Sequence, residues 1–169
     1  QVKTRFEKHY EKELQDNPIC VSLHFRIGDY KILPDCHPIL LDDYYLFSIM
    51  YIIQKCKEEK RPIKIFYLCE KQNNDEVFIR INRFTKFLHN KSIACEFIKL
   101  DDNMLDWEQL LAMSICDHNI IANSSFSWWG AYLNKNPNKI VVYPQTWFGV
   151  KMQHHKLHDM YPNTWIKQQ

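Results

Sequence analysis

The chain has 169 residues, of which 46% are hydrophobic and 25% charged, so it is long enough to bury one sizeable core. Its formal net charge is only +2, which excludes a general electrostatic attraction to nucleic acid or to an anionic membrane. The six cysteines form no C-x-x-C pair, a pattern typical of free thiols in a reducing compartment. We therefore expect one domain over residues 1–169, a cytoplasmic location and no nucleic-acid partner.

The first residues, QVKTRFEKHYEKELQ, are typical of a polar helix and not of a signal peptide. The sequence contains no run of roughly 18 to 20 apolar residues, the length that spans a bilayer. We therefore predict no membrane segment in this chain. Because the sequence does not begin with Met, further domains of a longer polypeptide are among its expected partners.

Short segments rich in β-branched and aromatic residues are predicted to form strands at 19–25, 63–69, 95–100, 119–122 and 139–143. Segments of helical length lie at 41–57, 74–89, 106–114 and 125–133. Strands that alternate with helices indicate a parallel sheet covered on both faces. The expected fold class is α/β, with a Rossmann-like, doubly wound parallel sheet. Beyond Pro144 the chain is aromatic, and we expect it to wrap over the sheet.

Only three glycines occur, at positions 28, 130 and 149. They cannot form the G-x-G-x-x-G fingerprint or a phosphate-binding P-loop, so both of these nucleotide sites are excluded. Open α/β sheets nevertheless bind ligands beyond the carboxyl ends of their strands. Two groups of polar residues lie at such positions.

The first group is HFRIGDY, which ends the first predicted strand. Strand alternation places His24 and Arg26 on the same face, and a guanidinium there is suited to bind a phosphate or a carboxylate. Gly28 is expected to permit a tight turn and a close approach to a ligand. The residues leave one alternative open, which is an ion pair between Arg26 and Asp29 that only caps the strand.

The second group, NSSFSWWGAYL, follows the fourth predicted strand and begins a helix. Asn123, Ser124 and Ser125 are typical helix-capping residues, and the free N–H groups of a helix start bind anions without a basic side chain. Alternatively, the serines only cap the helix while Trp128 and Trp129 pack in the core.

Both groups are expected at the same edge of the sheet, where Arg26 and the helix start at Ser125 would hold one diphosphate. The sequence shows no Ser-His-Asp triad, no cluster of metal ligands and no D-x-D motif. We therefore expect no metal and no cofactor.

These motifs resemble a known family. HFRIGDY resembles the H-x-R-R-G-D-Y signature of the α-1,2-fucosyltransferases of glycosyltransferase family 11. NSSFSWWGAYL resembles the later S-x-F-S-x-W-x-A-x-L block of that family, and YPQTWFG followed by MYPNTW resembles its carboxyl-terminal end. The resemblance extends from Ile19 to Trp165.

The resemblance implies an inverting, metal-independent enzyme of the GT-B type that transfers L-fucose from GDP-fucose to a sugar hydroxyl of a glycan acceptor. It implies that Arg26 binds the donor diphosphate and that His24 lies near the guanosine. The remaining donor-binding positions that it implies are Gly28, Asp106, Asn123, Ser124, Ser125 and Phe126. Asp106 would contact the nucleoside, and Ser124, Ser125 and Phe126 would hold phosphate.

The sequence departs from the family pattern in two places. Ile27 stands where the family usually has a second arginine, and the glycine loop of the family's amino-terminal half has no counterpart. The chain therefore resembles only the donor-binding half of a GT-B enzyme, with the acceptor half absent. Asp29 is our candidate for the catalytic base, although it would instead only orient Arg26 if the two are paired. Two other hypotheses remain open, a GDP-sugar binding module without activity and a transferase for another GDP-linked sugar.

Overall fold

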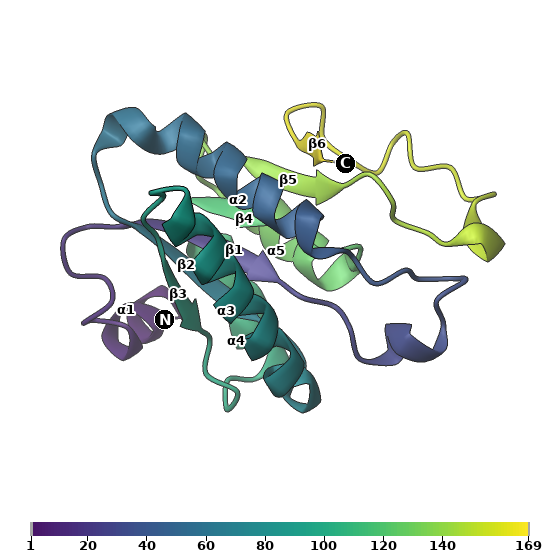
Figure 1. Ribbon diagram of the computed structural model, residues 1–169, viewed down its shortest axis with the longest axis horizontal. Coiled ribbons are helices and arrows are strands. Elements are labelled where there is room, and N and C mark those ends of the chain that lie inside the picture. The colour runs from purple at the N-terminus through teal and green to yellow at the C-terminus, as the bar shows by residue number, and fades with distance from the viewer. Residues whose placement is uncertain (1, 169) are drawn as a thin grey trace.

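The computed structural model describes residues 2–168, which contain a six-stranded sheet with every neighbouring pair parallel (Figure 1). The strands are β1 (Ile19–His24), β2 (Ile63–Leu68), β3 (Glu96–Lys99), β4 (His118–Ile120), β5 (Val141–Pro144) and β6 (Ile166–Gln168). Their order across the sheet is β3-β2-β1-β4-β5-β6, which is the Rossmann order. The predicted fold class is confirmed.

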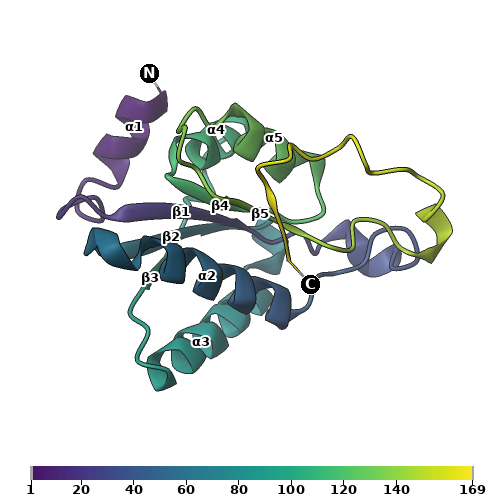
Figure 2. The same ribbon diagram turned by 90° about the horizontal axis from the view of Figure 1, so that it is seen from above.

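Helices cover both faces of the sheet, as Figure 2 shows. One face carries α2 (Asp42–Cys56) and α3 (Asn74–Asn90). The other face carries α1 (Val2–His9), α4 (Asp106–Ile115) and α5 (Ser125–Leu133). Short 3-10 helices lie at Asp29–Ile32, Lys57–Glu59, Lys71–Asn73 and Val150–Met152. Within the described residues, no helix is both long and apolar enough to cross a membrane.

The direction in which successive strands are added to the sheet reverses at β1, which pairs with β2 on one side and with β4 on the other. In this register Leu23 lies opposite both Tyr67 and Ile120. The chain builds the sheet outward from β1 in one direction and then in the other. The carboxyl ends of β1 and β4 therefore flank the topological switch point, where doubly wound sheets form their ligand crevice.

Each end of the chain has one feature that the sequence analysis did not predict. The amino-terminal helix is not polar on all sides, because Phe6 is 5% exposed and lies 5.2 Å, between ring centroids, from Phe66 of the sheet. The carboxyl-terminal segment does wrap over the sheet and buries Trp147 and Trp165. It also adds the strand β6, which its three residues, IKQ, did not predict because they show no apolar run.

Candidate functional site

The two predicted polar groups lie next to each other at the carboxyl edge of the sheet. His24 is the last residue of β1, and Phe126 lies in the first turn of α5. The centroids of these two rings are 5.4 Å apart. The Tyr30 hydroxyl donates a hydrogen bond of 2.7 Å to the backbone carbonyl of Asn123. The loop after β1 is thus attached directly to the loop after β4.

A pocket of about 340 Å³ lies at this junction, a size within the usual range for small-ligand sites. His24 and Arg26 line it from the end of β1, and Phe126 lines it from α5. Glu70 follows β2 and contributes a carboxylate, while Asp106 lines the pocket from the start of α4. Residues from two strand ends and two helix starts therefore surround one space.

Arg26 is paired with two carboxylates. Its Nη2 lies 2.9 Å from both carboxylate oxygens of Asp29. Its Nη1 lies 2.9 Å from Oε1 of Glu70. The ion pair with Asp29 that the sequence left open as an alternative is present. Because the guanidinium side chain is 27% exposed, part of it still faces solvent in the pocket.

Glu70 is a site residue that the sequence analysis missed. Its Oε2 accepts a hydrogen bond of 3.1 Å from Nδ2 of Asn73. Gly28 lies against this carboxylate, because a Cβ at position 28 would collide with it. No glycine in the described residues has a positive φ, so Gly28 serves to make room for Glu70 and not to form a left-handed turn. The same signal that marked Arg26, a charged residue just after a buried strand, was available for Glu70.

His24 is a neutral group at physiological pH. Its side chain is almost fully buried, with 4% exposure, and burial together with repulsion by Arg26 lowers its pKa to about 3. Its Nδ1 has no hydrogen-bond partner, which is unusual for a buried polar atom. The ring thus offers the pocket a neutral polar group beside the aromatic face of Phe126.

The start of α5 carries no side-chain cap. Ser124 is the N-cap residue, but its side chain makes no capping hydrogen bond. The Ser127 hydroxyl, at 3.2 Å from the backbone N–H of Ala122, is engaged with the preceding loop instead. The first N–H groups of the helix, at Ser125 and Phe126, therefore remain suited to an anion. The alternative in which Trp128 and Trp129 both pack in the core does not hold for Trp129, because this side chain is 49% exposed.

Asn123 is placed to hold loops together. It is 1% exposed, and its Nδ2 donates to the carbonyls of Pro38 at 2.9 Å and Trp147 at 3.1 Å. The two loops beyond the sheet edge also touch directly, because Gly149 N–H donates to the Cys36 carbonyl at 2.8 Å. Asn123 therefore fixes the surroundings of the pocket, while its Oδ1 has no partner.

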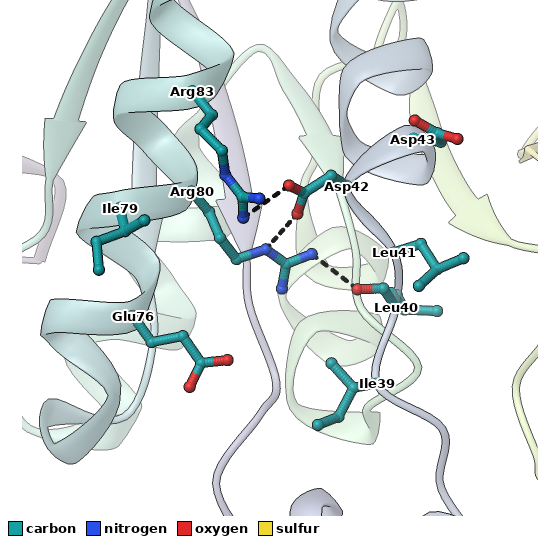
Figure 3. A pocket seen from close by; sticks show the side chains of 9 residues that line it. All are labelled: Ile39, Leu40, Leu41, Asp42, Asp43, Glu76, Ile79, Arg80 and Arg83. Carbon is teal, nitrogen blue, oxygen red and sulfur yellow. Dashed lines mark hydrogen bonds and ion pairs between the residues drawn. The ribbon is translucent and has the colours of Figure 1, made fainter.

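A larger groove, of about 760 Å³, lies between α2 and α3 and away from the polar motifs (Figure 3). Asp42 accepts a hydrogen bond from Arg80 at 2.5 Å and forms an ion pair with Arg83 at 2.9 Å, and Arg80 also donates to the Leu40 carbonyl at 2.8 Å (Figure 3). No residue of the two polar groups found in the sequence lines this groove, so it is a junction between helices and a weaker candidate for an anion site.

In the part of the chain that the structure describes, one group of side chains has the spacing of metal ligands, namely Cys56, Glu59 and His118. Nδ1 of His118 accepts a hydrogen bond of 3.0 Å from the backbone N–H of Ile140. The proton of the neutral ring is therefore on Nε2, which lies 3.2 Å from Sγ of Cys56. This Nε2 donates to sulfur and has no lone pair free for a metal.

The sheet has the Rossmann-like strand order, and the pocket lies beyond the carboxyl ends of β1 and β2, at the edge where such sheets form their ligand sites. The model of glycosyl transferase family 11 matches residues 10–169. The chain therefore belongs to glycosyltransferase family 11, and the resemblance stated from its motifs is confirmed.

Two relatives from Escherichia coli are similar to this chain. The O-antigen biosynthesis glycosyltransferase WbnK is 36% identical over 146 residues, covering 82% of this chain and 42% of WbnK. An alpha-1,2-colitosyltransferase is 32% identical over 168 residues, covering 92% of this chain and 51% of the relative. The chain thus spans about half the length of the curated relatives that it matches. No solved structure matches it.

Proposed function

We propose that this chain binds the donor of an inverting, metal-independent transferase that moves L-fucose from GDP-fucose to a sugar hydroxyl. The observation that carries the proposal is the convergence of Arg26 and the uncapped start of α5 on one pocket. Membership of glycosyltransferase family 11 supports a transferase that uses a sugar donor and an acceptor. The guanosine, the fucose and the glycan acceptor are inferred from the motif resemblance.

The proposed roles follow from the charge that develops during transfer. When the sugar leaves, negative charge grows on the departing diphosphate, and fixed hydrogen-bond donors stabilise it. Arg26 supplies a permanent positive charge, and the N–H groups at Ser125 and Phe126 supply the helix start. His24, which is neutral, and Asp106 both line the pocket and are available to the nucleoside.

Ile27 contributes nothing to phosphate binding. Its side chain is 1% exposed and packs in the hydrophobic core with Leu23 and Phe25. The family motif usually has a second arginine at this position. The side chain of Ile27 therefore offers no phosphate contact in its place. Arg26 and the helix start would hold the diphosphate without it.

Asp29 is better placed to orient Arg26 than to remove a proton. Both of its oxygens lie 2.9 Å from one guanidinium nitrogen. A base must turn towards the acceptor hydroxyl, and the contacts of both oxygens with one guanidinium hold Asp29 towards Arg26. We therefore propose an orienting role for Asp29.

A second candidate donor has a specific observation in its favour. One relative, 32% identical over most of this chain, is named for the transfer of a colitosyl group. A transferase for another guanosine-linked sugar is therefore a proposal of the same kind, with the same diphosphate site. A GDP-sugar binding module without activity is the third hypothesis, and it predicts donor binding without turnover.

The experiment that tests the proposal is a transfer assay with GDP-fucose and a panel of galactoside acceptors, in a chelator, using the wild type, Arg26→Ala and Arg83→Ala. Arg83 is the matched control because it is also paired with a carboxylate but lies in the other groove. Loss of one such preorganised donor typically lowers the rate about 100- to 1000-fold. We expect that loss for Arg26→Ala alone. Transfer by Arg26→Ala at the wild-type rate would refute the assignment.

A further inference from the structure

Glu70 occupies the side of Arg26 that faces the pocket. Arg26 and Glu70 both line the pocket, whereas Asp29 contacts the same guanidinium without lining it. The two carboxylates also bind different nitrogens, Asp29 on Nη2 and Glu70 on Nη1. An anion that reaches Arg26 from the pocket therefore meets the carboxylate of Glu70 first.

The charges around Arg26 are already more than balanced. One guanidinium faces two carboxylates, so this group of three side chains carries a formal charge of −1. A diphosphate that joined the group without displacing a carboxylate would add further negative charge at close range, where like charges repel. Departure of one carboxylate from the guanidinium would remove this repulsion and favour binding of the diphosphate.

Glu70, and not Asp29, is the carboxylate that an anion in the pocket would displace, because Glu70 lines the pocket and Asp29 does not. Asp29 lies three residues from Arg26 and both of its oxygens face Nη2. Glu70 comes from a different strand end and uses a single oxygen, Oε1, for its pair with Arg26. Its other oxygen is held by Asn73, and Gly28 leaves the space that the carboxylate fills. The carboxylate is thus seated in a prepared position inside the pocket.

We propose that Glu70 is an internal competitor for the anion that Arg26 binds. Its carboxylate takes the place of a phosphate while the pocket is empty and is displaced when a diphosphate enters. The inference rests on the proposed function, in that the anion is the diphosphate of a nucleotide sugar. Glu70 then lowers the affinity of the pocket for every diphosphate. The nucleotide left after transfer therefore dissociates more readily than it would if Arg26 had no competing carboxylate.

The test is calorimetric titration of the wild type and Glu70→Gln with inorganic pyrophosphate, and separately with GDP-fucose. Glutamine keeps the shape of the side chain and removes its charge. Glu76→Gln is the matched control, because Glu76 is also paired with a basic residue, Lys31, but lies outside this pocket. Thermal unfolding of each variant checks that the fold is retained.

Glu70→Gln is expected to bind pyrophosphate about two- to fivefold more tightly than the wild type, the range that one partly exposed ion pair contributes. Glu76→Gln is expected to bind as the wild type does. Equal or weaker binding by Glu70→Gln would overturn the inference, as would the absence of any pyrophosphate binding. An equal gain in both variants would also overturn it, since the effect would then be one of net charge.

The GDP-fucose titration separates this inference from the proposed function. If GDP-fucose binds the wild type and Glu70→Gln equally, the proposed donor site stands and the competitor role of Glu70 falls. If pyrophosphate binds Glu70→Gln more tightly but GDP-fucose binds neither protein, the competitor role stands and the proposed donor falls.

Discussion

Replacing Arg80 with alanine is expected to destabilise the protein strongly, although Arg80 lies outside the proposed site. Arg80 is only 6% exposed. Its Nε donates to Asp42 at 2.5 Å and its Nη2 to the Leu40 carbonyl at 2.8 Å. The guanidinium also lies 5.3 Å from the ring centroid of Phe25 and 5.1 Å from that of Tyr45. Phe25 lies between His24 and Arg26 in the sequence, so Arg80 packs against the segment that carries these two site residues.

The size of the effect follows from what the substitution leaves behind. Removing one partner of a buried ion pair typically costs about 3–5 kcal/mol because an unpaired charge remains buried. Asp42 would keep its 2.9 Å pair with Arg83, and its side chain is 28% exposed, which reduces that penalty. Lost packing on the two rings adds about 1 kcal/mol. We expect the free energy of unfolding to fall by about 2–4 kcal/mol.

The assay is urea denaturation of the wild type, Arg80→Ala and Arg83→Ala. The three proteins are expected to have the same m-value, which the same denaturation curves measure. Arg83 binds the same carboxylate, but its side chain is 62% exposed, so its loss should cost less than about 1 kcal/mol. Equal destabilisation by the two variants would refute the reasoning, because burial would then not determine the cost.

Three further predictions concern His24, Ser124 and Asn119. Burial lowers the pKa of His24 from 6.5 to about 3. Between these two pH values His24 takes up a proton only in the unfolded chain, so the free energy of unfolding falls as the pH falls. A His24→Gln variant should lose about 2 kcal/mol less between pH 7 and pH 5 in urea denaturation, and an equal loss would contradict the assigned pKa. Ser124→Ala should weaken GDP binding in calorimetry and change stability by less than about 0.5 kcal/mol, since Ser124 makes no cap bond; a loss of 1 kcal/mol or more would show that it caps. Asn119 is fully buried and donates to the Ser22 hydroxyl at 2.7 Å and the Met113 carbonyl at 2.8 Å, so Asn119→Ala should cost about 2–4 kcal/mol in thermal unfolding. A cost below about 1 kcal/mol would contradict that reasoning.

The sheet and the position of the pocket were predictable because they depend on local pattern. Short apolar runs alternate with helical segments, and this order alone indicates a parallel, doubly wound sheet. A charged residue directly after such a run then lies at the carboxyl edge, as Arg26 does. The fold and the common edge of the sheet that carries His24, Arg26 and the start of α5 therefore follow from the sequence before any contact is known.

The state of the site was not predictable because it depends on contacts between distant segments. Glu70 reaches Arg26 from another strand, and no spacing rule relates the two positions. The burial that makes His24 neutral comes from packing against α5, including Phe126. The strand β6 forms by pairing with β5, so its three residues carry no signal of their own.

We propose that Arg26 and the start of α5 bind a nucleoside diphosphate without a metal ion. Calorimetric titration of the wild type and Arg26→Ala with GDP and with UDP, first in a chelator and then with magnesium, tests it most directly. We expect that GDP binds in the chelator, that UDP binds more weakly and that Arg26→Ala removes GDP binding. GDP binding that requires magnesium, or that is unchanged in Arg26→Ala, would contradict the claim.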